Sequence, residues 1–192
     1  MNTARTLRTA PVGDIDTLAK PEIDEVVSLE SPAYEIFTDF THHHPIVIDS
    51  DLSVPQAEAF MQRAHVKLAL VVDQRERFLG MLSYGDLIGD RYQQLLGQGT
   101  AQEAISVKAV MVHRDELRAV AYEELAGATI GMVVDTLRKE HRQHFLVVDD
   151  QPKIRGIFSA SDIARRLHVA IDIAKAPTFA DICHVMFGHT HP

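Results

Sequence analysis

An internal repeat constrains the fold of this chain more than any other feature of its sequence. The residues VVDQRERFLGMLSYGDLI (71–88) align without a gap with VVDDQPKIRGIFSASDIA (147–164), at an offset of 76 residues. Six of these 18 positions are identical: Val71/Val147, Val72/Val148, Asp73/Asp149, Gly80/Gly156, Ser83/Ser159 and Asp86/Asp162. Upstream, EIFTDF and AVMVHR correspond at an offset of 74, which places about two extra residues near 123–127 in the second copy. The sequence therefore predicts two homologous units.

Each unit is predicted to contain a strand, a helix, two further strands and a closing helix. In the first unit, β-branched and apolar runs predict strands, and an amphipathic stretch after Ser53 predicts a helix. The first unit's elements are expected at 45–48, 53–64, 67–73 and 78–82, with helical spacing resuming from Tyr84. The second unit's elements are expected at 118–122, 130–137, 144–149, 154–158 and 159–171. The fold class is α/β, with a small sheet in each unit covered by helices on one side.

Charge and composition divide the chain further. Residues 1–41 carry three basic and eight acidic side chains, and the first residues show little helical or strand periodicity. We therefore expect a flexible acidic arm at the N-terminus. The expected division is an arm at 1–30, a first domain at 31–98, a linker at 99–106, a second domain at 107–171 and a tail at 172–192.

Composition also excludes several classes of function. The net charge of −8 disfavours binding to DNA or RNA, which needs clustered lysine and arginine side chains. The single cysteine, Cys183, excludes an intramolecular disulfide and a cysteine-based zinc cage. The N-terminus has no hydrophobic signal-like stretch, and no apolar run is long enough to cross a membrane. A cytoplasmic protein is expected.

The repeated motif resembles the cystathionine-β-synthase (CBS) domain, which occurs in tandem pairs called Bateman modules. The family pattern is a Val-Val-Asp strand end, a polar turn, and a strand of type Gly-hydrophobic-hydrophobic-Ser/Thr-x-x-Asp. The first copy has Asp73, Gly80 and SYGD in these places, and the second has Asp149, Gly156 and SASD. The resemblance covers about residues 35–170 and implies two CBS repeats packed as a pseudo-two-fold pair.

A ligand is suggested by the Ser-x-x-Asp motif where a strand leads into a helix. Helix N-termini favour phosphate, and a carboxylate in the first turn can accept hydrogen bonds from two ribose hydroxyls. By resemblance, Asp86 and Asp162 hold ribose, and Ser83 and Ser159 contact ribose or phosphate. The resemblance also implies an adenine pocket near two strands, formed by Ile46, Val47, Ile48, Val120, Ala121 and Tyr122.

The same motif has a second interpretation that needs no ligand. Ser/Thr-x-x-Asp/Glu is also a capping box, in which both side chains satisfy free N–H groups at a helix start. The two copies differ in charge, because Arg165 and Arg166 follow Asp162 whereas Gly89 and Asp90 occupy these places after Asp86. We therefore predict tighter nucleotide binding at Ser159/Asp162, with Arg165 and Arg166 near phosphate. Alternatively, the two arginines form a solvated helix face.

Histidines offer a different candidate site. His42–His44 precede the first predicted strand, and the tail contains Cys183, His184, His189 and His191. Neither cluster has the spacing of a structural zinc site, so no metal ligands are predicted. The sequence also lacks a phosphate loop, a nucleophile elbow and a His-Glu-x-x-His motif, and we predict no enzymatic activity.

The function expected from the resemblance is a non-enzymatic regulatory sensor. Its ligand would be AMP, ADP or ATP, and S-adenosylmethionine or a cyclic dinucleotide would also fit. The family's usual self-association implies a homodimer that passes its state to an unidentified protein partner. Two alternatives remain: a ligand-free interaction or dimerisation module, and a metal-responsive protein that uses its histidines.

Overall fold

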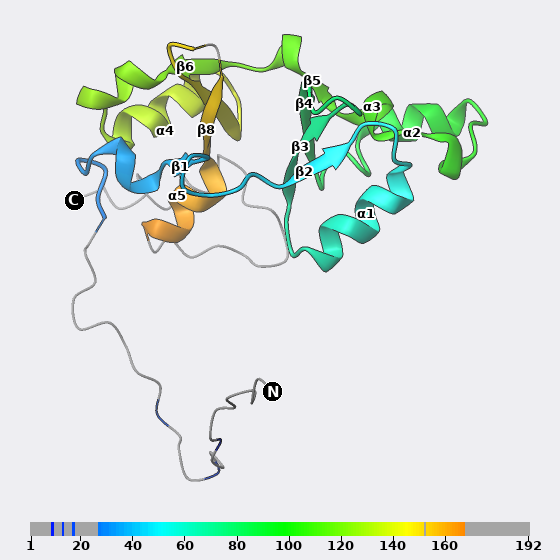
Figure 1. Cartoon of the computed structure of the whole chain (residues 1–192), viewed down its shortest axis with the longest axis horizontal. Coiled ribbons are helices and arrows are strands. Elements are labelled where there is room, and N and C mark those ends of the chain that lie inside the picture. Colours follow the sequence, from blue (N-terminus) through cyan, green and yellow to red (C-terminus); the bar gives the residue numbers. More distant parts are fainter. Residues whose placement is uncertain (1–8, 10–12, 14–16, 18–26, 152, 168–192) are drawn as a thin grey trace, which may run out of the picture.

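The computed structural model describes residues 27–151 and 153–167, together with Thr9, Gly13 and Thr17. Within these residues the strands form two four-stranded sheets, which lie side by side with helices on their outer faces (Figure 1). The predicted α/β class with two repeats is confirmed. None of the helices in the described part of the chain has the length and apolarity to cross a membrane.

The first sheet has the strand order β2-β3-β4-β5. Its strands are β2 (Val47–Asp49), β3 (Leu68–Val72), β4 (Phe78–Ser83) and β5 (Val112–His113). Helix α1 (Val54–Arg63) connects the parallel strands β2 and β3, and a tight turn connects the antiparallel strands β3 and β4. Helices α2 (Asp90–Gly97) and α3 (Val107–Val110) follow, with the 3-10 turn η2 (Gln102–Ala104) between them.

The second sheet repeats this plan in the order β1-β8-β7-β6. Its strands are β1 (Thr38–Asp39), β6 (Ala119–Ala121), β7 (His144–Val148) and β8 (Ile154–Ser159). Helix α4 (Ile130–Lys139) joins β6 to β7, and α5 (Ala160–Arg166) follows β8. The 3-10 turns are η1 (Ala33–Ile36), η3 (Arg114–Glu116) and η4 (Tyr122–Gly127).

The two repeats exchange their first segments. Strand β1 precedes the first repeat in the chain but pairs with β8, and β5 precedes the second repeat but pairs with β4. The helical turn before each of these strands packs with the same sheet as the strand does. Ile36, before β1, lies in the core beneath the second sheet, and Val110, before β5, lies in the core beneath the first. The sheet and the core of each repeat are therefore completed by the first segment of the other repeat.

The structure corrects the predicted position of the extra residues. Eight residues separate β6 from α4, whereas four separate β2 from α1, so the second copy is four residues longer at this point. The first copy is two residues longer between β1 and β2, where the loop at 40–46 contains the three adjacent histidines. The net difference of two is as predicted, but it is the sum of two opposite changes.

A third apolar cluster joins the two sheets. Side chains alternate between the two faces of a strand. One face of each sheet is therefore covered by helices, and the other faces the opposite sheet. The facing residues are Leu70 and Met81 from the first sheet and Leu146 and Ile157 from the second, and all four are buried. This cluster defines a seam between the repeats.

Candidate ligand-binding site

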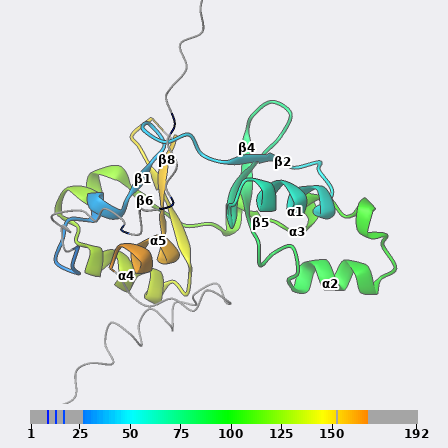
Figure 2. The same ribbon diagram turned by 90° about the horizontal axis from the view of Figure 1, so that it is seen from below.

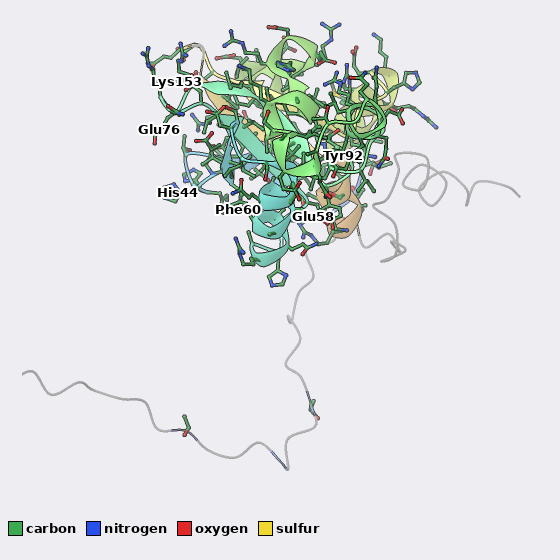
Figure 3. The ribbon with its side chains drawn as sticks, turned by 90° about the vertical axis from the view of Figure 1, so that its right-hand side faces the viewer. His44, Glu58, Phe60, Glu76, Tyr92 and Lys153 are labelled. Atoms are coloured by element: carbon green, nitrogen blue, oxygen red, sulfur yellow. The ribbon has the colours of Figure 1, made fainter. Side chains whose placement is uncertain are left out.

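The two Ser-x-x-Asp motifs lie at the same end of this seam. Ser83 and Ser159 each stand two residues after a strand residue of the seam, Met81 and Ile157, so alternation places them on the seam face. The turns β3–β4 and β7–β8 lie at the opposite ends of β4 and β8. Figure 3 shows Glu76 and Lys153, one from each turn, on the same side of the molecule.

In the first copy the motif is closed on itself. The carboxylate of Asp86 accepts hydrogen bonds from the backbone N–H and the hydroxyl of Ser83, both at 2.7 Å. The Ser83 hydroxyl oxygen in turn accepts from the backbone N–H of Asp86 at 3.3 Å. This is the reciprocal pattern that the capping interpretation predicts.

The predicted helix after Ser83 is wrong for its first turn. Residues 84–89 form successive turns, and α2 begins at Asp90 with Gly89 as its N-cap. Gly85 and Gly89 explain the delay, because a glycine in a helix interior costs about 1 kcal/mol relative to alanine. Asp86 therefore lies outside a helix, and its carboxylate stabilises a turn.

In the second copy the motif stays open. Helix α5 begins at Ala160 and carries Asp162 in its first turn, as predicted, and Ser159 makes no side-chain cap. The Ser159 hydroxyl lies 2.8 Å from that of Ser161. The carboxylate of Asp162 pairs with Arg165 in the same helix, and the two side chains are 36% and 73% exposed. Surface ion pairs of this kind contribute about 0–1 kcal/mol, so a ligand can displace Arg165 readily.

The residues expected to contact adenine face different surroundings. Ile48 packs in the first core and Val120 against the second. Ile46 and Val47 are 40% and 46% exposed and leave apolar surface beside β3. Ala121 is also exposed.

Tyr122, which follows β6, is already in contact with charged and aromatic groups. The guanidinium of Arg155 stacks over its ring at 4.5 Å from the centroid, and the ring of Tyr34 meets it edge-on at 5.9 Å. Arg155 also binds the Asp39 carboxylate through two hydrogen bonds of 2.9 Å. These contacts make Tyr122 part of the surface that attaches β1 to the second sheet.

Sequence reasoning missed one residue at this end of the seam, His144. It begins β7 directly opposite Ser159, whereas the first copy has Leu68 opposite Ser83. Burial lowers the pKa of His144 below its ordinary value, and the negative charges of Asp162 and Asp86 partly oppose this effect. The exchange of an apolar residue for a titratable one at the 76-residue offset is the signal that could have revealed it.

The other histidine candidates contribute no comparable cluster. His42, His43 and His44 are exposed in the loop before β2. Among the described residues no group of three or more His, Cys, Asp or Glu side chains is placed to hold a metal ion. The tail candidates Cys183, His184, His189 and His191 lie outside the described residues.

The model of the CBS domain family matches residues 36–91 and 107–169, more than half of the chain. The chain belongs to the CBS domain family. The two segments confirm the tandem pair that the repeated motif predicted. No curated protein sequence matches the chain.

Solved structures share the fold of this CBS pair. An uncharacterised conserved protein from Pyrococcus horikoshii is 18% identical, with a TM-score of 0.56 over 76% of this chain and 98% of its own. A CBS-domain protein from Agrobacterium tumefaciens is 16% identical, with a TM-score of 0.53 over 78% and 98%. CBSX2 in complex with AMP is 18% identical, with a TM-score of 0.50 over 70% and 94%. CBS domain proteins are regulatory modules.

Proposed function

We propose that this CBS pair is a non-enzymatic sensor of an adenine nucleotide, with AMP, ADP or ATP as its ligand. The observation that carries the proposal is the environment of the Asp162 carboxylate. It lies in the first turn of α5, at the end of the seam, and its ion-pair partner is the exposed Arg165. A carboxylate in this state can accept hydrogen bonds from the two vicinal hydroxyls of a ribose. Ser159 would contact the ribose or phosphate beside it.

The positive charges next to Asp162 favour a ligand that carries phosphate. When ribose displaces Arg165 from Asp162, the guanidinium becomes available to a phosphate in the same site. Arg166 is exposed next to it and adds positive charge. In the first copy the exposed Ile46 and Val47 would flank the base. In the second copy Ala121 pairs with Val148, so Ala121 and Tyr122 lie at the far end of β7 from His144 and Ser159.

The two copies should differ in affinity. A ligand at Asp86 would have to break the hydrogen bonds that this carboxylate accepts from Ser83, and these bonds hold the turn in place. A ligand at Asp162 displaces one exposed ion pair. We therefore propose that Ser159/Asp162 is the tighter site. The known complex of CBSX2 with AMP supports an adenine nucleotide as ligand for this fold.

The ligand would act by shifting the relative positions of the two repeats. It can do so only by the difference in its affinity for two arrangements. A cytoplasmic homodimer that passes this change to a protein partner is the assembly we propose. S-adenosylmethionine and a cyclic dinucleotide are the other adenosine-containing ligands that this chemistry admits.

Replacement of the two aspartates separates the sites. We expect Asp162→Ala to weaken AMP binding at least tenfold, because one charged hydrogen-bonding group is worth about 1.5–3 kcal/mol. Asp86→Ala should weaken it less than about threefold, measured by calorimetric titration on folded protein. Equal losses in the two variants would contradict the assignment to the second copy.

A ligand-free interaction module is the second candidate. The observation that favours it is that both carboxylates have partners within the chain, Ser83 for Asp86 and Arg165 for Asp162. It predicts that AMP, ADP, ATP and S-adenosylmethionine all leave the melting temperature unchanged. A nucleotide at a hundred times its Kd adds about 2.7 kcal/mol, a shift of roughly 5–10 °C that the same experiment would detect.

A further inference from the structure

His144 lies beside the motif of the second copy, directly opposite Ser159 on β8. It shares the seam face of β7 with Leu146, because the two residues are two positions apart, and Phe145 between them points into the second core. Ser159 lies opposite it on β8, and the backbone N–H of Ala160, the first residue of α5, donates to the carbonyl of the preceding Gln143 at 2.9 Å. The start of β7 is thereby fixed against the start of α5.

The imidazole is influenced by carboxylates from both repeats. Asp162 comes from the second repeat and Asp86 from the first, and both favour its protonated form. Burial acts in the opposite direction and is the larger effect, so the pKa of His144 is lowered. The imidazole of His144 is therefore protonated at a more acidic pH than an ordinary histidine.

The charged groups on the elements around His144 determine how strongly its protonated form is favoured. Arg165 is paired with Asp162, and Arg118, which precedes β6, lies 3.8 Å from Glu140. The charged and titratable residues on the bordering elements are Lys67 before β3, Asp86 after β4, Arg118 before β6, His141 and Arg142 before β7, and Asp162, Arg165 and Arg166 on α5. Asp162 and Asp86 are the two whose charges act on the imidazole.

We propose that His144 makes the ligand site pH-dependent, so that an anionic adenine nucleotide binds more tightly when the imidazole carries a proton. This proposal rests on the proposed function. A phosphate placed near Asp162 and Arg165 adds negative charge beside His144 and so favours its protonation. Because such coupling is reciprocal, protonation of His144 strengthens binding of the phosphate by the same factor. In this scheme His144 acts through its charge on the nearby phosphate. Asp162 remains the group that contacts ribose.

The chain itself supplies the matched variant. The first repeat has Leu68 in the place of His144, so His144→Leu installs a residue that the fold already accepts at this position. We expect the AMP affinities of wild type and His144→Leu to agree at about pH 7.5. At about pH 5.5 the wild type should bind at least threefold more tightly than the variant. Their ratio cancels the titration of the nucleotide phosphate itself. A ratio that is the same at both pH values would overturn the proposal.

A measurement without ligand separates this proposal from the proposed function. In an NMR titration, the His144 signal is identified by its loss in His144→Leu. Asp162→Asn and Asp86→Asn should each lower its pKa measurably, because each removes a negative charge that favours the protonated form. Asp149→Asn, at the other end of the same strand, is the control and should leave it unchanged. If AMP fails to bind while these shifts appear, the proposed function fails and the coupling between the repeats stands. If neither aspartate variant shifts the signal, the coupling is refuted.

Discussion

Gly156→Ala is expected to lower the free energy of unfolding by about 3 kcal/mol, the upper end of the usual range for an overpacked site. A Cβ at this position would overlap the carbonyl oxygen of Thr38 and lie 2.5 Å from two ring carbons of Phe37. Both neighbours belong to the exchanged N-terminal segment, which pairs with β8 at this point. The methyl group can be accommodated only if β1 moves away from the second sheet.

Thermal unfolding measures this effect directly. For a chain of this size we expect the melting temperature to fall by roughly 6–12 °C. Gly97→Ala is the matched control, because a Cβ at the end of α2 meets nothing within 4 Å. Gly80→Ala should resemble Gly156→Ala, since its Cβ would overlap the carbonyl oxygen of Val112 on the other exchanged strand. Equal melting temperatures for Gly156→Ala and Gly97→Ala would show that the segments are not exchanged as described.

Asp39→Asn should cost about 1–2 kcal/mol at neutral pH and almost nothing in strong acid. Burial raises the pKa of Asp39, but hydrogen bonds from Arg155 and Thr41 outweigh it and lower the pKa to about 2. Because the folded-state pKa lies below the ordinary value of 3.8, the stabilisation is present above about pH 4 and disappears as the pH falls towards about 2. The Asp39 and Arg155 side chains are 13% and 25% exposed, so solvent screens their interaction only in part.

Urea unfolding of wild type and variant at several pH values tests this expectation. The difference in unfolding free energy should be constant from neutral pH down to about pH 4 and then shrink. Asp115→Asn is the control, because Asp115 and Arg114 form an ion pair at 3.9 Å with highly exposed side chains. A difference for Asp39→Asn that does not vary with pH would mean that the negative charge of Asp39 contributes nothing to stability.

The regular elements of both repeats could be predicted from the sequence because their signals are local. Strands β3 and β7 are continuous apolar runs, and their structural bounds differ from the predicted ones by one residue at each affected end. Helix α1 begins after Ser53, whose backbone N–H donates to the Gln56 side chain as a serine N-cap pattern suggests. The 76-residue offset then related the central helix and the two strands after it in one copy to those in the other.

The exchange of segments could not be predicted in this way. Strands β1 and β5 have two residues each, too few to show any alternation, and their partners lie far away in the chain. The glycine repeated in both copies carried the information, since Gly80 and Gly156 lack a side chain at the points where the exchanged strands approach. Without the structure they could not be assigned to this contact.

The different charges that follow the two motifs could be read from the sequence, but the hydrogen bonds of their carboxylates could not. Both Ser-x-x-Asp motifs read alike, yet Asp86 binds Ser83 and Asp162 binds Arg165. The difference arises from Gly85 and Gly89, which delay the helix in the first copy, and from Arg165, whose position one turn after Asp162 lets it reach the carboxylate. No local motif marked His144, because only the pairing of β7 with β8 places it beside Ser159.

Calorimetric titration of AMP into the wild-type chain tests most directly whether this CBS pair senses a nucleotide. We expect saturable binding with one strong site per chain, because Asp86 is held by Ser83 whereas Asp162 has only an ion pair with the exposed Arg165. Absence of saturable heat with AMP, ADP and ATP would contradict it. So would two sites of equal affinity.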